Sequence, residues 1–448
     1  MRRDGLLPRR TGPVGDSRSR SLKSAGPTLY PTHGFSPGHE VIRLQRSPLF
    51  VALFTVFVDL IGFGVIIPFL PFYAKVVGGQ DGPAILGGLV AVFFLMQFGF
   101  SAIFGRLSDR IGRRPVILGS LVLATAGHLV LSIATSSIVL LFAARILAGI
   151  GSGNLSVAQA YVADRTRPEE RARGMGLIGA AFGVGFAVGP VIGGLLQPFG
   201  LAAPALGAAV LAATNFGLAS LYLPESLTRE AREKNGRESH AKFLDIARRP
   251  ALRALLIAFV IVSFAFSAVP VAFPSLAIEL YGFQPLQLVL IFIYIGVINV
   301  IFGNAAGRLA RRIGTERLVA LGSFAIMIGL LLVPWAQHWS VYVLLTGVVA
   351  AGVAIAFPLI PSLVSKRTPP QEQGSVLGVA QSLGSLARVP GPLVAGFLFD
   401  RVSPASPFLV GAALMAIGFG ATLVVYRERG RSSAAPAGLS VESMVRRD

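Results

Sequence analysis

The chain of 448 residues contains no cysteine and few charged residues. Without cysteine it forms no disulfide bonds and performs no thiol chemistry, and its redox compartment stays undetermined. Only 14% of the residues are charged, whereas 53% are hydrophobic and the mean hydropathy is +0.70. These values lie outside the range of soluble domains. The sequence therefore predicts that most of the chain lies in a lipid bilayer.

Motifs of soluble enzymes are also missing. The glycines of "GVGFAVG" (183–189) follow no predicted strand, and no acidic residue lies at dinucleotide-binding distance from them. The five histidines show no metal-ligand spacing. Since no P-loop is present, ATP is not the expected energy source. We therefore expect no catalytic residues, no metal and no cofactor.

Segments of about 20 apolar residues, long enough to cross about 30 Å of hydrocarbon, recur twelve times. Fifty-two glycines favour closely packed helices over a β-barrel. The predicted fold class is an all-α integral membrane protein with twelve transmembrane helices. The predicted spans are 49–71, 84–105, 115–134, 138–162, 174–197, 202–223, 251–279, 285–306, 318–335, 340–364, 375–399 and 408–426.

Acidic residues are scarce, because 21 Asp and Glu stand against 40 Lys and Arg. Of these 40, 36 precede the first predicted span, follow an even-numbered span or lie in the C-terminal tail, if Arg253 at the start of the seventh span is included. Such spacing follows the positive-inside rule rather than a nucleic-acid-binding face. We therefore expect a multi-pass protein of the bacterial inner membrane, with both termini cytoplasmic and no nucleic-acid partner.

Three segments outside the predicted spans are hydrophilic. Residues 1–48 are rich in Arg, Ser, Gly and Pro, and we expect a disordered basic tail. A transit peptide or an overlong start assignment would have the same composition. Residues 224–250 are the predicted cytoplasmic linker, and residues 427–448 are the predicted cytoplasmic C-terminal tail.

The sequence also repeats itself with an offset of 202 residues. The offset aligns Gly105-Arg106-Leu107 with Gly307-Arg308-Leu309 and Gly189-Pro190 with Gly391-Pro392. It predicts two six-helix halves in parallel orientation, residues 49–223 and 251–426. A solute site at the interface of the halves, open alternately to each side, follows from this arrangement.

Three stretches resemble motifs of a known family. These are "GRLSDRIGRRPVI" (105–117) after span 2, "RILAGIGSG" (145–153) in span 4 and "GVGFAVGPVIGG" (183–194) in span 5. They resemble the loop signature, the fourth-span arginine motif and the fifth-span antiporter motif of the major facilitator superfamily. The chain is most similar to its twelve-span drug/proton antiporter group, which includes tetracycline efflux pumps, over residues 49–426.

The resemblance implies a secondary active transporter. We expect proton-coupled export of small lipophilic or amphipathic compounds by alternating access, with the substrate, protons and the bilayer as partners and a monomer as the working unit. A facilitator or proton symporter for a polar metabolite is the alternative among transporters. A non-transporting membrane receptor or scaffold is the alternative from another class.

The loop signature contributes the expected gate. Gly105 lets the end of span 2 approach a neighbouring helix. The resemblance places Asp109 against the start of span 11, where a carboxylate gains about 0.3–1 kcal/mol beside a helix N-terminus. It also pairs Arg113 with a carboxylate at the end of span 4, so that the halves are held together on the cytoplasmic side. The expected gate residues are Gly105, Asp109, Arg110, Gly112, Arg113 and Asp164.

Two alternatives concern these motifs. The charges of the loop signature could serve only to direct topology, and Arg311 replaces the aspartate in the second copy. In span 5, glycines at i, i+4 and i+8 form one smooth helix face beside a proline that bends the helix. In relatives this face packs the halves together, and the alternative is ordinary close packing. The motif residues are Gly185, Gly189, Pro190, Gly193 and Gly194.

Asp59 lies ten residues into the first predicted span, about 15 Å deep. A charged residue costs at least about 2.5–3.5 kcal/mol at the centre of a membrane helix, so this carboxyl group is expected to exchange a proton. We predict that Asp59 carries the coupling proton and that Arg145 of span 4 is its partner. The alternative is a static structural pair.

Polar residues on shared helix faces are the remaining candidates. In span 4 they recur at steps of three and four from Arg145, and in span 11 they recur up to Arg388. Cavity lining and polar packing between helices are the two interpretations, and an ion pair with Glu279 is an alternative for Arg388. The predicted cavity residues are Gln97, Ser152, Asn154, Ser156, Gln159, Tyr294, Asn299, Gln381, Ser385 and Arg388.

Overall fold

The computed structural model describes residues 48–434, with gaps at 135, 167–170, 228–248 and 370–371. Within the helices, the side chains of residues 171–176 and 374–375, among others, lie outside this description. The predicted tail 1–48, apart from its last residue, most of the linker 224–250 and most of the C-terminal tail 427–448 also lie outside it. In the part of the chain that is described, every regular element is a helix.

The first half contains six spans, two of which are interrupted by a short 3-10 turn. The residues Ile67–Phe69 join α2 to α3, and the residues Ser152–Asn154 join α6 to α7. Proline at or near the start of a helix costs no hydrogen bond, which suits Pro83 at the start of α4. The helices are α2 (Pro48–Ile66) with α3 (Leu70–Gly78), α4 (Gly82–Ile111), α5 (Arg113–Ile133), α6 (Ile138–Gly151) with α7 (Leu155–Arg165), α8 (Arg171–Leu196) and α9 (Ala202–Tyr222).

The second half repeats this arrangement. Pro250 and Pro285 begin two of its helices, and the side chain of Gln284 caps the second of them. A break before Pro390 divides the eleventh span. The helices are α12 (Pro250–Tyr281), α13 (Pro285–Ile313), α14 (Thr315–Leu332), α15 (Trp339–Lys366), α16 (Gln373–Ala387) with α17 (Pro390–Arg401), and α18 (Ser406–Ala434).

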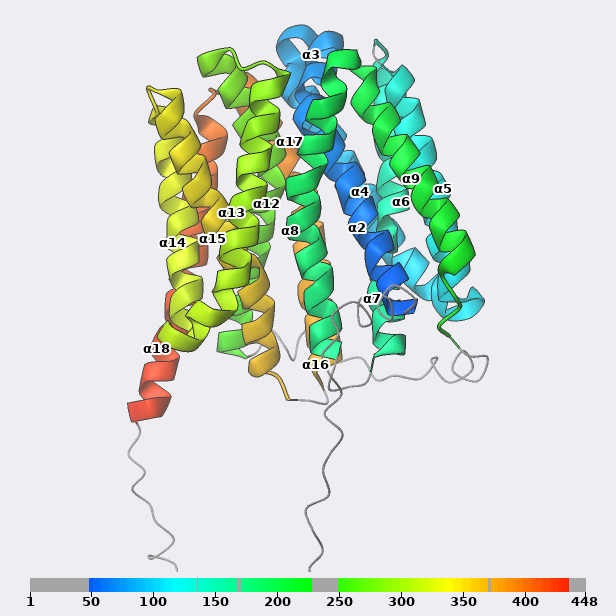
Figure 1. Cartoon of the computed structure of the whole chain (residues 1–448). Coiled ribbons are helices and arrows are strands. Elements are labelled where there is room, and N and C mark those ends of the chain that lie inside the picture. Colours follow the sequence, from blue (N-terminus) through cyan, green and yellow to red (C-terminus); the bar gives the residue numbers. More distant parts are fainter. Residues whose placement is uncertain (1–47, 135, 167–170, 228–248, 370–371, 435–448) are drawn as a thin grey trace, which may run out of the picture. The chain divides into compact units, whose positions relative to one another are not determined.

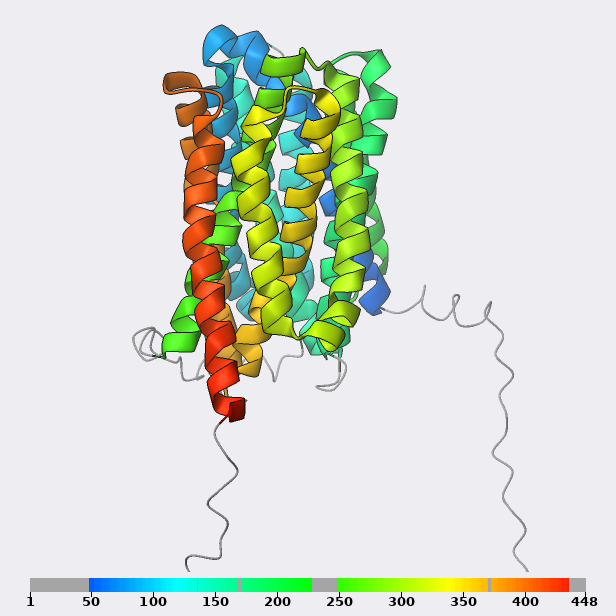
Figure 2. The ribbon, with the colours of Figure 1, turned by 90° about the vertical axis from the view of Figure 1, so that its left-hand side faces the viewer.

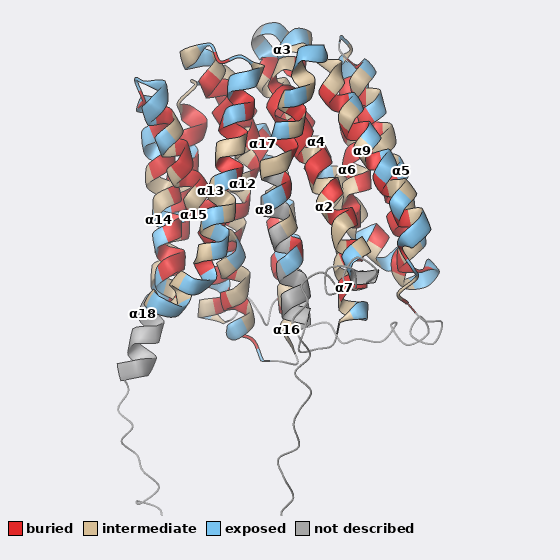
Figure 3. Ribbon diagram, viewed as in Figure 1, coloured by how far each residue is buried: buried red, intermediate tan, exposed pale blue. Residues whose placement is uncertain are grey.

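The predicted membrane architecture is confirmed. Eleven spans in the described ranges are long and apolar enough to cross a bilayer, and α8, with 26 residues, makes a twelfth. Large apolar side chains such as Leu195, Leu221 and Phe397 are exposed on the outer faces of the helices, where lipid would cover them. Buried and exposed residues interleave along each helix in Figure 3, because only one face packs against other helices.

The stretch 105–117, which we expected to be a loop, is almost entirely helical. α4 continues to Ile111 and α5 begins at Arg113, so Gly112 alone joins them. Its φ of 111° is a conformation that side-chain-bearing residues rarely adopt. Gly314 makes the equivalent turn between α13 and α14 with a φ of 90°. The sequence repeat is therefore also a repeat of backbone geometry.

Because the number of spans is even, the start of the first helix and the end of the last helix lie on the same side of the bundle. We call this side, where α2 begins and α18 ends, the tail end, and it lies at the bottom in Figures 1 and 2. The two halves meet along α8 with α13 and along α4 with α17. A Cβ atom added to Gly296 of α13 would lie 2.5 Å from the Cα of Ala187 in α8, so these two helices touch through their backbones.

Candidate functional site

A polar cavity lies between the halves near the middle of the spans. Its first-half wall comes from α2, α4 and the turn between α6 and α7, and its second-half wall comes from α12 and the break between α16 and α17. The lining residues are Val56, Asp59, Leu60, Phe63, Phe93, Phe94, Gln97, Ser152, Asn154, Leu155, Phe266 and Arg388. Aromatic rings and a few ionisable groups therefore share one chamber, which suits an amphipathic ligand.

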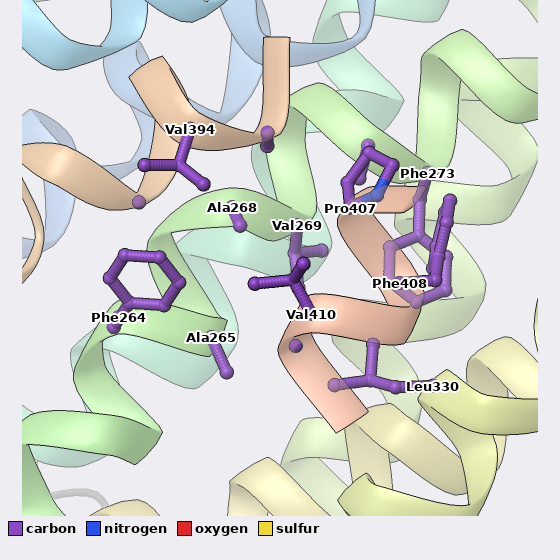
Figure 4. Close-up of a pocket in the computed structure, with 14 residues that line it drawn as sticks. Phe264, Ala265, Ala268, Val269, Phe273, Leu330, Val394, Pro407, Phe408 and Val410 are labelled. Carbon is purple, nitrogen blue, oxygen red and sulfur yellow. The ribbon is translucent and has the colours of Figure 1, made fainter. Parts of the chain in front are cut away.

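A second pocket lies within the second half, among α12, α14, α17 and α18. Figure 4 shows Phe264, Val269, Phe273, Val394 and Phe408 around it. All fourteen lining residues are apolar or glycine, and none is a predicted site residue. Because this pocket contains no group that can bind a proton or orient a polar solute, the cavity between the halves is the candidate functional site.

Asp59 lies in this cavity and is held by an amide. The Asn154 Nδ2 group donates hydrogen bonds to the Asp59 Oδ2 atom and to the Ser120 Oγ atom, each at 3.0 Å. Asn154 ends the short 3-10 turn between α6 and α7, which directs its side chain toward α2. Three helices thereby fix the carboxyl group of Asp59 at mid-depth.

The expected pair between Asp59 and Arg145 is not formed in the described structure. Arg145 is buried, its guanidinium carbon lies 4.4 Å from the centre of the Phe93 ring, and its Nε atom has no hydrogen-bond partner in the described part of the chain. Arg145 precedes Asn154 by nine residues, which is about 13 Å along a helix. Asp59 therefore lies at the same depth in the bundle as Asn154. Arg145 lies closer to the end of the bundle opposite the tail end.

Sequence reasoning missed His128, a buried histidine five residues before the end of α5. Its Nδ1 atom has no partner among the described residues, and its Nε2 atom lies 3.4 Å from the position of a Cβ atom on Gly62. Gly62 follows Asp59 by three residues on α2. The signal available in the sequence was a histidine inside an apolar span, without the spacing of a metal ligand.

The polar face of span 4 divides between two roles. Ser152 lines the cavity, and the Gln97 Nε2 group donates a hydrogen bond of 3.3 Å to its carbonyl oxygen. Ser156 instead donates to the carbonyl oxygen of Ser101 in α4 at 2.9 Å. A Cβ atom on Gly149 would lie 2.6 Å from the carbonyl oxygen of Phe93, so this part of the face packs directly on α4. Gln159, further along, does not line the cavity.

Of the second-half candidates, Arg388 alone lines the cavity. The hydroxyl of Tyr294 lies over Gly347 of α15, and the Asn299 amide donates to the carbonyl oxygen of Ile295 on its own helix. Gln381 is exposed, and Ser385 lies outside the lining as well. The helical period predicted a shared face, but these side chains turn toward neighbouring helices or away from the cavity.

Arg388 lies 5.7 Å, measured from its guanidinium carbon, from the centre of the Phe357 ring. Its Nε atom is buried without a hydrogen-bond partner in the described chain. The alternative pairing with Glu279 is not formed, because Glu279 is exposed two residues before the end of α12. The described halves thus bring Asp59 and Arg388 into one cavity, and Arg145 lies behind its wall, over the Phe93 ring.

The expected gate residues form a charged cluster at the tail end. The Arg113 Nη1 atom lies 2.7 Å from Asp109 Oδ1, and its Nε atom lies 3.2 Å from Asp164 Oδ2. The expected contact between Arg113 and Asp164 is therefore present, but it joins α5 to α7 within the first half. The start of span 11, where we expected Asp109, lies outside the described side chains. Arg110 is exposed beside this cluster.

Glu225, which the sequence analysis did not single out, completes the cluster. Its two carboxylate oxygens accept hydrogen bonds from the backbone N–H groups of Arg113 and Arg114, at 2.9 and 3.2 Å, at the start of α5. A carboxylate at this position stabilises a helix. The available signal was an acid in "LPES" (223–226), directly after an apolar span.

The fifth-span glycines pack mainly within the first half, which differs from the expected seal between halves. A Cβ atom on Gly189 would lie 2.7 Å from the Cα atom of Gly64 in α2. Gly185 and Gly193 meet α2 and the turn that follows it in the same way, and Pro190 is buried in α8 beside them. Two motif positions face the second half, since Gly194 lies against Val289 of α13 and Ala187 lies against Gly296 of the same helix. The motif therefore fixes the position of α2, which carries Asp59.

Comparisons with known proteins agree with this geometry. A family model described as Major Facilitator Superfamily matches residues 52–392. The chain is 31% identical to tetracycline resistance protein class C of Escherichia coli, over 83% of this chain and 95% of that protein. It is 30% identical to multidrug resistance protein 2 of Bacillus subtilis, over 88% of this chain and 98% of that protein.

Among solved structures, the human organic anion transporter MFSD10 (TETRAN) superposes with a TM-score of 0.65. It is 26% identical, and the alignment covers 85% of this chain and 99% of that one. The family match over residues 52–392, the twelve helices in two halves and the cavity between them therefore identify the chain as a member of the Major Facilitator Superfamily, an integral membrane protein and a secondary transporter.

Proposed function

We propose that this transporter exports small lipophilic or amphipathic compounds in exchange for protons, with Asp59 as the proton carrier. The observation that carries the proposal is the carboxyl group of Asp59 in a cavity lined by both halves, beside four phenylalanine rings. A substrate that contacts this carboxylate excludes the proton, and a proton excludes the substrate. Such mutual exclusion is the requirement for exchange transport.

The names of its relatives, a tetracycline resistance protein and a multidrug resistance protein, support the direction and the substrate class. The excess of Lys and Arg before the first span and after the even-numbered spans supports a cytoplasmic location of both termini, and the bacterial sources of these relatives support a bacterial inner membrane. We further propose that the chain works as a monomer without a cofactor, driven by the proton gradient.

The test is substrate-dependent proton movement in inverted vesicles or proteoliposomes. In the presence of an imposed pH gradient, adding a tetracycline or a cationic dye should dissipate the gradient in vesicles with the wild-type protein. Vesicles with Asp59→Asn should show no such change at equal protein content. Substrate uptake without any proton movement in the wild type would instead indicate a facilitator.

A second candidate, transport of organic anions, is favoured by the two arginines near the cavity. Arg388 lines the cavity, its Nε atom has no hydrogen-bond partner in the described chain, and the solved relative is named an organic anion transporter. An anion held by Arg388 would be repelled by the charged form of Asp59, so it would bind together with the proton. Binding of an anion should therefore weaken as pH rises through the titration of Asp59, whereas binding of a cation should strengthen.

A further inference from the structure

The first and second halves make a tight contact at the end of the bundle opposite the tail end. A Cβ atom on Gly87 of α4 would lie 2.5 Å from the carbonyl oxygen of Pro392, and one on Gly396 of α17 would lie 2.4 Å from that of Pro83. Side chains larger than hydrogen cannot enter this contact without moving the helices. The described structure is thus closed at this end.

A carboxylate crosses the same contact. The backbone N–H of Ala84, the third residue of α4, donates a hydrogen bond of 2.7 Å to the Oδ2 atom of Asp400, the penultimate residue of α17. The N-terminus of α4 has its own capping residue, Asp81, but the Asp81 side chain makes no capping hydrogen bond. Asp81 instead lies 3.4 Å from Arg401. The second half therefore caps a helix of the first.

The tail end of the same helix differs. Asp109, two residues before the end of α4, pairs with Arg113 within its own half at 2.7 Å. A Cβ atom on Gly105 would meet, in the described chain, only the Ser156 Oγ atom at 3.9 Å, and one on Gly307 would meet nothing within 4 Å. In the described chain, carboxylates thus connect the two halves at the closed end, through Asp400 and Asp81.

We propose that Asp400 is the gate residue of this end: its carboxylate caps α4 across the halves, holds the end closed, and must release Ala84 in each transport cycle. A capping carboxylate is worth a modest free energy and is lost when the helices separate. It therefore biases the equilibrium between the two access states without locking it. The proposal requires alternating access, but no particular substrate or coupling ion.

The absence of cysteine from the chain makes the test direct. Spin labels on cysteines introduced at Val76 and Trp339 report the distance between halves at the closed end, and labels at Tyr222 and Arg311 report it at the tail end. All four positions are exposed. Asp400→Ala should change the ratio of the two populations by about tenfold. The favoured state should have a longer distance between the labels at the closed end and a shorter distance at the tail end.

Two further variants separate the cap from charge and from folding. Asp400→Asn should keep most of the closed population, because its carbonyl oxygen can accept the same N–H. Asp81→Ala removes an acid from the exposed pair at the same end and should change the population ratio less than twofold. If Asp400→Ala does not fold, Asp400→Glu, whose longer side chain displaces the carboxylate, takes its place.

The proposal is overturned if a folded Ala or Glu variant of Asp400 has the wild-type distance distributions at both ends. It is also overturned if Asp81→Ala shifts them as far as Asp400→Ala does. Neither result affects the proposed role of Asp59, which is tested by proton movement. Conversely, a failure of proton coupling leaves the distance measurement unchanged.

Discussion

The two halves of the molecule turn the chain in the same way but carry different chemistry at the turn. Gly112 and Gly314 each join two spans with a positive φ. Beside Gly112 the first half has Asp109, which pairs with Arg113, whereas the equivalent of Asp109 in the second half is Arg311, which is exposed. The repeat has preserved the backbone and not the charges, so Asp109 has no acidic counterpart at the equivalent turn of the second half.

The walls of the cavity differ in the same sense. The first half contributes a carboxyl group, Asp59, held by the amide of Asn154, and the second half contributes Arg388 over a phenylalanine ring. The proposed proton exchange and the proposed recognition of a negative charge thus belong to opposite walls. Each of the following changes tests whether the halves are as unequal as this comparison indicates.

The largest effect is expected from Asp59→Asn, which removes the titrating group of the first-half wall. Uphill efflux should vanish, because substrate movement is no longer linked to proton movement, while exchange of substrate for substrate should persist. The measurement is proton release when substrate is added to detergent-solubilised protein. Equal release from the wild type and the variant would contradict the assignment, and Asp81→Asn, at an exposed site, is the control.

Gly189→Leu should have the next largest effect. Its side chain would overlap the backbone of Gly64, separate α8 from α2 and either stop transport or let protons leak through the protein. The equivalent change in the second half, Gly391→Leu, meets the Ser267 Oγ atom and should be damaging too. Gly303→Leu meets open space and serves as the control. Coupled transport that survives Gly189→Leu would show that this packing is dispensable.

Asp109→Asn should slow transport by about tenfold or more while the protein remains inserted and folded, on the scale of a lost charge-assisted contact. The matched change at the equivalent position of the second half, Arg311→Gln, should leave the rate near that of the wild type. Initial rates in proteoliposomes measure both. Equal slowing by the two changes would mean that the tail-end charges act only through membrane topology.

The smallest effect is expected from Arg388→Gln, and it depends on the charge of the substrate. Binding of an organic anion should weaken by about tenfold, since a hydrogen bond to a charged group is lost, whereas binding of a neutral compound should change little. Fluorescence quenching by paired anionic and neutral dyes measures this, with Arg401→Gln as the control. Unchanged anion binding would remove the second candidate function.

The sequence was sufficient for the spans, their number and the two-half arrangement, because long apolar runs have few structural alternatives in a membrane. It misplaced the end of span 2. Hydropathy falls at Arg106, yet α4 continues to Ile111, because charged residues outside the hydrocarbon remain good helix formers. A hydropathy boundary marks the edge of the lipid rather than the end of the helix.

The site was predicted less completely, and the reasons are geometric. Asp59 was identified from depth alone, but its partner depends on how the antiparallel α2 and α6 are offset, which a single sequence does not contain. Asn154 therefore takes the place expected for Arg145. Glu225 was missed because it caps a helix more than 100 residues away in sequence. Its role exists only once the helices are packed.

The length of α4 has a mechanical consequence. This helix runs unbroken for 30 residues, about 45 Å, from the contact with α17 to Asp109. Near its midpoint, Gly149 of α6 presses against the backbone of Phe93 and the Cβ atom of Met96, which makes a fulcrum. A tilt of about 10° around that point moves each end by about 4 Å in opposite directions. A rigid helix that pivots near its midpoint moves its two ends in opposite directions. When one end of α4 approaches the second half, the other end therefore moves away from it, and no further coupling between the two ends is needed.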